Sequence, residues 1–240
     1  MGFPSFRIQP LGDAALLVHF GDAIDGELNE AVLALFHRIR ALDLPGLLDV
    51  VPAYGSLAVY YDVYTVRQFS PGGVTAYETV AGHILQMHAE PAVAADGAIR
   101  KLTVPVCYSL KFAPDLALVA GQKGITPQEV VRLHTARIYR VYMIGFLPGF
   151  AYMGEVDERI AVPRHAQPRR QVDAGCVGIA GRQTGIYPLA SPGGWQIVGR
   201  TPLKLFDPAR EVPSLFRPGD EVQFYSIEED EFENYQSGHP

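Results

Sequence analysis

The chain has few cysteines, a single tryptophan and no long apolar run. Its 240 residues include only two cysteines, Cys107 and Cys176, which lie far apart in apolar segments without a neighbouring Cys or His at metal-ligand spacing. This pattern is typical of reduced, packed thiols and does not indicate a metal site. No window approaches 18 consecutive apolar residues, and the first ten residues lack the pattern of a signal peptide. We therefore expect a cytoplasmic protein.

The common catalytic and nucleotide-binding motifs are also absent. The sequence has no G-x-x-x-x-G-K-[ST] phosphate loop, and "GIAGRQTG" does not have the spacing of the dinucleotide fingerprint. It has no H-E-x-x-H, G-x-S-x-G or Ser-x-x-Lys pattern. We therefore predict no cofactor bound by this chain alone, and chemistry that is unconventional or shared with a partner.

The whole chain carries a formal net charge of −6, but its basic residues gather in one stretch. Between residues 159 and 206 there are seven basic residues and one acidic residue, Asp173, so this stretch has a net charge of +6. A local arginine excess in an acidic protein indicates a site for a small anion rather than for nucleic acid, which usually binds a basic domain. A solvated or partner-facing patch explains the pattern equally well.

Residues 1–92 are predicted to form a small α+β domain. Residues 14–20 have the pattern of an apolar strand, and apolar residues spaced by three and four between 28 and 42 indicate an amphipathic helix. Two strands joined at Tyr54-Gly55 precede a second helix from 74 to about 88. The Ala-rich segment 88–100, which contains a proline and an Asp-Gly turn, is the best candidate for a linker.

Residues 100–227 are predicted to form a second, mostly β domain. A strand at 101–108 is followed by a helix near Pro114-Asp115 and by another at "TPQE", where Thr126 and Glu129 form a capping box. Beyond Tyr139, short apolar segments separated by Gly and Pro predict a closed or nearly closed barrel. The acidic tail, 228–240, is expected to be frayed.

The arginine-rich stretch contains two Pro-Arg dipeptides, at 163–164 and 168–169, followed by the only tryptophan. A proline stiffens the backbone before each guanidinium, so we predict that Arg164 and Arg169 point into a shared concave site and bind an anion. Trp195 follows two glycines and either offers a flat surface to a ligand or partner or lies in the barrel core. The predicted substrate-binding residues are Arg164, Arg169, Tyr142, Phe146, Pro148, Phe150, Ser191, Gly193, Gly194 and Trp195.

A predicted catalytic group consists of His134, Gln183 and Tyr187 around one pocket at the barrel mouth. There a histidine and an amide could position a small cyclic amide and shuttle a proton. A structural interpretation of His134 competes with this one, because a histidine near a helix C-terminus interacts favourably with the helix dipole. Taken singly, Tyr187 and Tyr142 each fit a core tyrosine with a satisfied hydroxyl better than a functional one.

The barrel segments resemble a known family. "VYMIGFLPGFAYMGEVDERIAVPRHAQPRRQV" and "AGCVGIAGRQTGIYPLASPGGWQIVGRTPLKLFD" are similar to the B subunits of bacterial 5-oxoprolinase, also called allophanate hydrolase subunit 1 or KipI-like proteins, and the resemblance covers nearly the whole chain. It implies a small N-terminal α+β domain of ferredoxin-like type and a cyclophilin-like β-barrel of the carboxyltransferase type. Cys176 stands where relatives usually have serine.

The resemblance also implies a function that depends on partners. In 5-oxoprolinase, a B subunit of this kind acts with a KipA-like C subunit and a third subunit to open 5-oxoproline to glutamate with ATP. We therefore expect one component of a hydrolase complex that is inactive alone, with ATP bound in the assembled complex. Two alternatives remain open: the carboxyltransferase module of an allophanate or urea carboxylase system, and inhibition of a sensor histidine kinase. Neither nucleic acid nor a membrane is expected as a partner.

Overall fold

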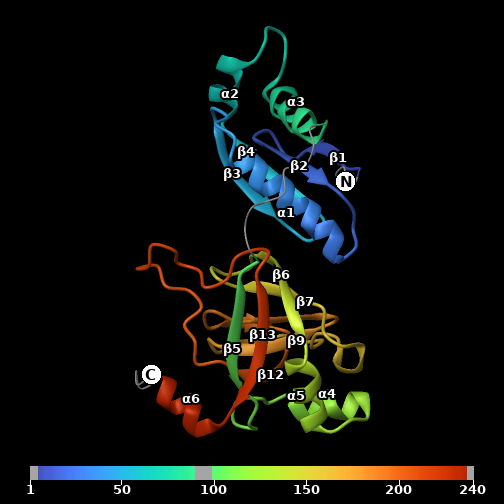
Figure 1. Cartoon of the computed structure of the whole chain (residues 1–240), viewed down its shortest axis with the longest axis vertical. Coiled ribbons are helices and arrows are strands. Elements are labelled where there is room, and N and C mark those ends of the chain that lie inside the picture. The colour runs from blue at the N-terminus through green and yellow to red at the C-terminus, as the bar shows by residue number, and fades with distance from the viewer. Residues whose placement is uncertain (1–4, 90–98, 237–240) are drawn as a thin grey trace. The chain divides into compact units, whose positions relative to one another are not determined.

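The computed structural model describes residues 5–89 and 99–236, and it divides the chain into two compact units, Met1–Ala98 and Ile99–Pro240 (Figure 1). Each unit has its own hydrophobic core and is described by itself. Most of the predicted linker, residues 90–98, lies outside the described residues. No helix in the described part of the chain is long and apolar enough to cross a membrane.

In the N-terminal unit, the described residues 5–89 form a four-stranded antiparallel sheet with three helices. The sheet order is β1-β2-β4-β3, and buried strand residues such as Leu16 and Val59 pack against Leu35 and Ile84 of the helices. The element order ββαββαα differs from the βαββαβ order of a ferredoxin-like domain, so that part of the expected fold is not confirmed. The elements are β1 (Arg7–Pro10), β2 (Ala15–His19), α1 (Gly26–Arg40), β3 (Leu47–Pro52), β4 (Ser56–Tyr61), α2 (Val63–Phe69) and α3 (Ala76–Ala89).

The C-terminal unit contains a closed seven-stranded barrel, as its short Gly- and Pro-separated segments predicted. The strand order is β10-β7-β6-β13-β5-β12-β9, in which only β5 and β13 pair in parallel. This architecture is consistent with a cyclophilin-like barrel. The barrel strands are β5 (Lys101–Cys107), β6 (Ile138–Ile144), β7 (Ala151–Gly154), β9 (Cys176–Ala180), β10 (Gln183–Ile186), β12 (Gln196–Arg200) and β13 (Glu221–Ile227).

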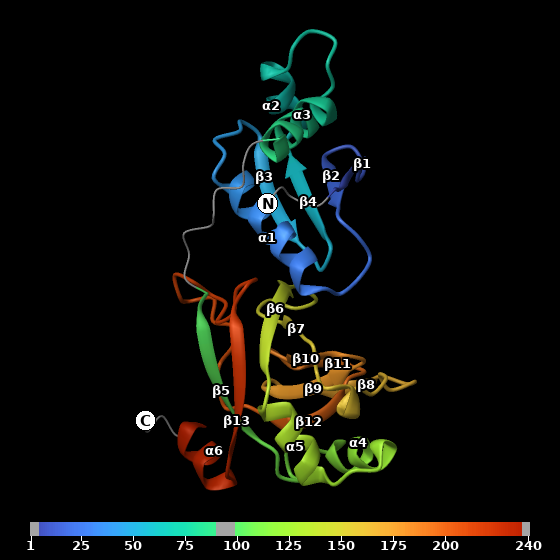
Figure 2. The same cartoon turned by 45° about the vertical axis from the view of Figure 1, so that its right-hand side comes forward.

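A separate two-stranded ribbon lies outside the barrel wall. It consists of β8 (Arg169–Val172) and β11 (Ser191–Gly193), and Figure 2 shows it beside β9 and β10. The barrel interior is filled by residues such as Val177, Ile179 and Ile186. Alternate residues of the same strands face outward and form a second apolar cluster there. This outer cluster consists of Phe150, Val172, Cys176, Ala180, Tyr187, Trp195 and Ile197. The barrel wall therefore separates two apolar cores.

Four helices accompany the barrel: α4 (Leu116–Lys123), α5 (Pro127–Thr135), the 3-10 turn η1 (Glu158–Ile160) and α6 (Glu229–Gln236). The predicted start of α5 is confirmed, because Thr126 Oγ1 accepts a hydrogen bond from the Glu129 backbone N–H at 3.2 Å. The reciprocal half of the capping box is absent, since the Glu129 carboxylate pairs with Arg132.

The acidic tail is not frayed over its described length. Residues 229–236 form α6, and its Phe232 is only 2% exposed and packs against Phe112 with ring centroids 4.3 Å apart. A single buried aromatic side chain thus anchors a helix whose other residues are mostly charged. The prediction of a frayed tail was wrong for these residues because it considered only their charge.

Candidate functional site

Trp195 lies on the outer face of the barrel wall rather than in its interior. The side chain is 4% exposed and meets the Phe150 ring edge-on at a centroid distance of 5.4 Å. Two strand glycines lie beneath it: an added Cβ would stand 2.9 Å from Trp195 Cβ at Gly178 and 3.1 Å from Trp195 Cζ3 at Gly185. Because these glycines have no side chains, the indole can pack directly against the strand backbone.

Tyr187 belongs to the same outer cluster. Its ring lies 5.4 Å from that of Phe150, and an added Cβ at Gly193 would clash with the Tyr187 hydroxyl oxygen. Burial raises the pKa of Tyr187 above its usual value, while a hydrogen bond with the Trp195 backbone acts in the opposite sense. Its hydroxyl is therefore protonated at neutral pH, and Gly193 is required for the close approach of β11.

Phe146 sits at the exposed edge of this cluster in a strained turn. Its φ is +67°, a region that bulky side chains rarely occupy, and the Leu147 N–H donates to Gly145 O at 2.8 Å, which closes a three-residue γ-turn around it. The side chain is 61% exposed and contacts the edge of the Phe150 ring. Strain of this kind persists at sites where the surroundings over-determine the conformation, often functional ones.

Arg164 lies across the face of Trp195. Its guanidinium carbon is 5.9 Å from the ring centroid, within the range of a cation–π interaction. Arg164 is exposed, and none of the carboxylates in residues 5–89 or 99–236 pairs with it. Its N–H donors are consequently available to an external anion.

Arg169 is committed elsewhere, contrary to the predicted shared site. Its Nη2 donates to Asp115 Oδ1 at 2.5 Å, and Asp115, 4% exposed, also accepts from the Ile197 N–H at 2.6 Å. His165 Nε2 lies 3.3 Å from the second oxygen of the same carboxylate. The two arginines therefore have different surroundings: Arg164 lies over Trp195, and Arg169 is in a partly buried ion pair.

His134 is inside the barrel, not at its mouth. It is fully buried, stacked on Phe224 with centroids 4.6 Å apart, and its two ring nitrogens lie 2.7 Å from the Tyr108 hydroxyl and 2.9 Å from Thr184 Oγ1. Burial lowers the pKa of His134 from 6.5 to about 3. With no access to solvent and a neutral ring, it holds the core together and cannot serve as an accessible acid or base.

The proposed catalytic trio is not brought together. Thr184 faces the barrel interior, so its strand neighbour Gln183 faces away from His134, and Tyr187 lies in the outer cluster. The trio is separated because the barrel wall lies between His134, on its inner side, and Tyr187, on its outer side. Sequence periodicity in so short a strand did not show which face each residue would take.

The remaining predicted residues also separate into groups. Phe150 is buried in the outer cluster, and Pro148 is exposed in the turn before it. Ser191 lies in β11 opposite Val172, and Gly194 directly precedes Trp195. Tyr142 is buried against Gly154 of β7, where an added Cβ would stand 2.9 Å from its ring, and is not part of the cluster. Sequence reasoning missed Tyr152, whose ring lies 4.7 Å from Phe150, and Asp115.

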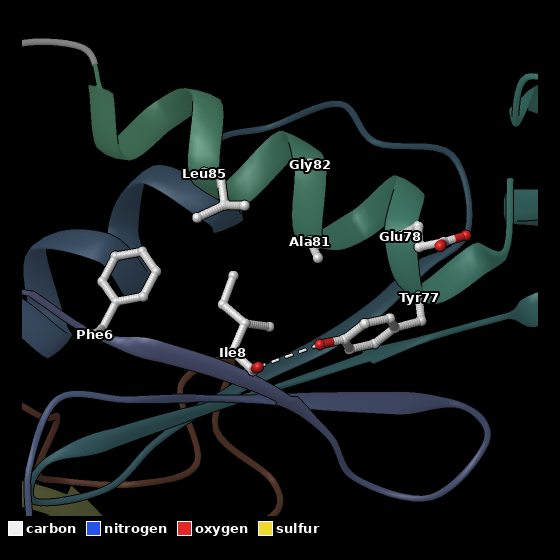
Figure 3. Close-up of a pocket in the computed structure, with 7 residues that line it drawn as sticks. All are labelled: Phe6, Ile8, Tyr77, Glu78, Ala81, Gly82 and Leu85. Atoms are coloured by element: carbon white, nitrogen blue, oxygen red, sulfur yellow. Dashed lines mark hydrogen bonds between the residues drawn. The ribbon is translucent and has the colours of Figure 1, made fainter.

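The N-terminal unit has a cleft of about 400 Å³ that the sequence did not predict (Figure 3). It lies between α3 and the edge strand β1, where the Tyr77 hydroxyl donates to Ile8 O at 3.2 Å. Its one carboxylate, Glu78, already accepts hydrogen bonds from Thr75 at the start of α3. The cleft contains none of the predicted site residues and is lined by Phe6, Ile8, Tyr77, Glu78, Ala81, Gly82 and Leu85.

Sequence comparison finds relatives of the full length of the chain. It is 42% identical to the B subunit of 5-oxoprolinase from Bacillus subtilis (strain 168), with 96% of this chain and 97% of that protein aligned. It is 38% identical to the B subunit of 5-oxoprolinase from Escherichia coli O157:H7, with 91% and 94% aligned. Urea amidolyase of Saccharomyces cerevisiae is 26% identical over 96% of this chain but only 14% of that protein.

Structural comparison agrees with these relationships. The solved structure of TTHA0988 is 38% identical with a TM-score of 0.76; the match covers 89% of this chain, which spans only 40% of that longer one. Urea amidolyase of K. lactis shares the fold, with a TM-score of 0.72 at 19% identity, over 98% of this chain and 16% of that one. The family model for the carboxyltransferase domain, subdomain C and D, matches residues 6–216. The chain therefore belongs to the carboxyltransferase subdomain C and D family, together with the proteins named as B subunits of 5-oxoprolinase.

Proposed function

We propose that this chain is a non-autonomous subunit of an ATP-dependent 5-oxoprolinase, which opens 5-oxoproline to glutamate together with a KipA-like C subunit and a third subunit. The observation that carries the proposal is the 42% identity to the B subunit of 5-oxoprolinase from Bacillus subtilis along 96% of this chain and 97% of that protein. An alignment of this extent matches both domains of the chain.

The outer aromatic cluster supports the proposal through its chemistry. The substrate, 5-oxoproline, is a small cyclic amide that carries one carboxylate. Arg164 offers unpaired guanidinium donors for such a carboxylate, and charge-assisted hydrogen bonds of this kind contribute about 1.5 to 3 kcal/mol. The exposed Phe146 ring adds an apolar surface at the edge of the same cluster. We assign substrate contact to Arg164 and Phe146, backed by Phe150, Tyr187 and Trp195.

The residues of this chain indicate which steps of the reaction it performs and which belong to the other two subunits. It has no phosphate loop, and its fully buried His134 is neutral and closed off from solvent. Tyr187 is protonated at neutral pH and is buried among aromatic neighbours. We therefore assign ATP binding and the proton transfers of ring opening to the other two components, and positioning of the substrate carboxylate to this chain.

Reconstitution tests the proposal. The purified chain, the chain with the C subunit, and the complete set of three components are each assayed for 5-oxoproline-dependent ATP hydrolysis and for glutamate. We expect turnover only with the complete set. Turnover by this chain alone, or by the other two components without it, would contradict the proposal.

A second candidate is a carboxyltransferase role in a urea carboxylase system. It is favoured by the description of the family model and by the alignment with urea amidolyase of Saccharomyces cerevisiae. The same reconstituted samples can be given urea, bicarbonate, ATP and a biotinylated carrier in place of 5-oxoproline. Urea-dependent ATP hydrolysis without 5-oxoproline turnover would support this candidate instead.

A further inference from the structure

A buried carboxylate joins three elements that are distant in sequence. Asp115, directly before α4, exchanges two hydrogen bonds with Ile197 of β12: its N–H donates to Ile197 O at 3.0 Å, and Ile197 N–H donates to its Oδ2 at 2.6 Å. The other oxygen of Asp115 accepts from Arg169, at the end of the 163–169 segment. His165 of the same segment lies 3.3 Å from Asp115 Oδ2.

The 163–169 segment is the one that presents Arg164. Most of it is exposed, so few apolar contacts fix its path. It is held by polar contacts on both sides of Arg164: Gln196 Nε2 donates to Pro163 O at 3.1 Å, His165 N–H donates to Gly194 O at 2.7 Å, and Arg169 pairs with Asp115. These residues border Trp195, over which the Arg164 guanidinium lies.

We propose that Asp115 is a positioning residue: through its ion pair with Arg169, and with His165 close to the same carboxylate, it holds the 163–169 segment on β12, so that Arg164 stays over Trp195 and can bind the substrate carboxylate. The inference rests on the proposed function for the identity of that substrate. Asp115 also neutralises the charge of Arg169, so that Arg169 does not compete with Arg164 for the ligand. Without Asp115, the partly buried Arg169 would lose its partner and would move toward water, taking the segment with it.

The chain supplies a matched control for this proposal. Asp220 is also 4% exposed, pairs with Arg100 at 2.5 and 2.8 Å, and accepts from the Arg217 N–H at 2.7 Å, but none of these hydrogen bonds involves the 163–169 segment. Asp115→Asn and Asp220→Asn each remove a buried carboxylate that faces an arginine and a backbone N–H. Any general cost of such a loss should therefore appear in both variants.

Steady-state kinetics of the assembled complex separate positioning from stability. We expect Asp115→Asn to raise KM for 5-oxoproline about tenfold with kcat little changed, and Asp220→Asn to leave KM unchanged. In the double variant with Arg164→Ala, the effect of Asp115→Asn should vanish, because Asp115 acts through Arg164. Equal KM values for the two Asn variants, or a full additional tenfold rise in the double variant, would overturn the proposal.

A second measurement does not depend on the proposed activity. Trp195 is the only tryptophan, so its fluorescence in the isolated full chain reports on this site. Asp115→Asn should shift the emission to longer wavelength and increase quenching by iodide, whereas Asp220→Asn should change neither. If Asp115→Asn does not fold, Arg169→Gln against Arg100→Gln makes the same comparison. Unaltered Trp195 fluorescence in the folded variant would overturn the positioning role of Asp115, even if the complex turns over 5-oxoproline. A shift in Trp195 emission without 5-oxoproline turnover would count only against the proposed function.

Discussion

His134 donates through Nε2 to Thr184 Oγ1 at 2.9 Å inside the barrel, and the Thr184 hydroxyl in turn donates to Gly178 O at 3.0 Å. Because Thr184 uses its proton on Gly178, His134 carries its own proton on Nε2 and accepts from the Tyr108 hydroxyl at Nδ1, 2.7 Å away. The three side chains form a one-directional hydrogen-bond chain across the barrel. Its orientation requires a neutral imidazole.

This arrangement predicts a loss of stability in mild acid. The pKa of His134 falls from 6.5 to about 3 on folding, so the unfolded chain takes up a proton below about pH 6.5 while the folded chain does not. The contribution is therefore fully present above pH 6.5 and is lost as the pH falls toward 3, at up to about 1.4 kcal/mol per pH unit. Urea unfolding at about pH 7 and pH 5 should show this loss in the wild type and a shallower one in His134→Gln.

The window from pH 7 to pH 5 isolates the histidine. The pKa of Asp157 is also lowered, by its hydrogen bonds with Arg159, but that contribution is lost only as the pH falls below its usual value of 3.8. A variant of the exposed His83 serves as the control and should keep the wild-type slope. An equal slope in the wild type and His134→Gln would show that the buried histidine is not the titrating group.

Gly185→Ala should destabilise the barrel unit by disturbing the packing of Trp195 against β10. The added Cβ would stand 2.9 Å from Ala151 O and 3.1 Å from Phe150 Cζ, and overpacking of this kind costs about 1 to 3 kcal/mol. Gly121→Ala in α4 is the matched control, because its Cβ meets nothing within 4 Å and alanine favours a helix by about 1 kcal/mol. Urea unfolding should therefore move in opposite directions for the two variants, and a shift in the same direction would refute the packing described for Trp195.

Phe232→Ala should destabilise the barrel unit although it lies in the acidic tail. Phe232 is 2% exposed in a cluster with Cys107 and Ile227, and truncation of a buried Phe costs about 3 to 5 kcal/mol. Tyr235→Ala, in the same helix but 46% exposed, should change the free energy of unfolding by less than about 0.5 kcal/mol. Similar small effects for both would mean that α6 contributes nothing to the fold.

The sequence predicted best those structural features that depend on a local sequence pattern. Short apolar segments between glycines and prolines identified the barrel, and Thr126 before Pro127 located the start of α5, because turn residues and helix caps act within a few positions. The seven-residue α2 has no comparable periodic stripe, and no helix was predicted there.

The candidate site could not be predicted fully, because it is formed by contacts between residues far apart in the sequence. Asp115 meets Arg169 and Ile197, which are 54 and 82 residues away, so its burial could not be inferred from the segment around it. The Pro-Arg dipeptides drew attention to 163–169, but only the fold separates the exposed Arg164 from the paired Arg169. From the sequence, His134 near the end of α5 fitted both a structural and a catalytic role. Only its complete burial in the structure separates the two.

Arg164→Lys should restore only part of what Arg164→Ala removes. Lysine keeps the positive charge near Trp195, but its ammonium cannot reproduce the two parallel donors of a guanidinium toward a carboxylate. We expect KM for 5-oxoproline in the assembled complex to rank wild type below Lys and Lys below Ala. Identical KM values for Lys and Ala would mean that charge plays no part in the contact.

The central claim is that this chain supplies part of the 5-oxoproline site, and Arg164→Ala tests it most directly when KM and co-purification with the C subunit are measured on the same preparation. The loss of about 1.5 to 3 kcal/mol of charge-assisted contact predicts a KM raised by roughly one to two powers of ten, with the complex intact. Loss of co-purification would instead place Arg164 in the interface with that protein, and an unchanged KM in an intact complex would contradict the account.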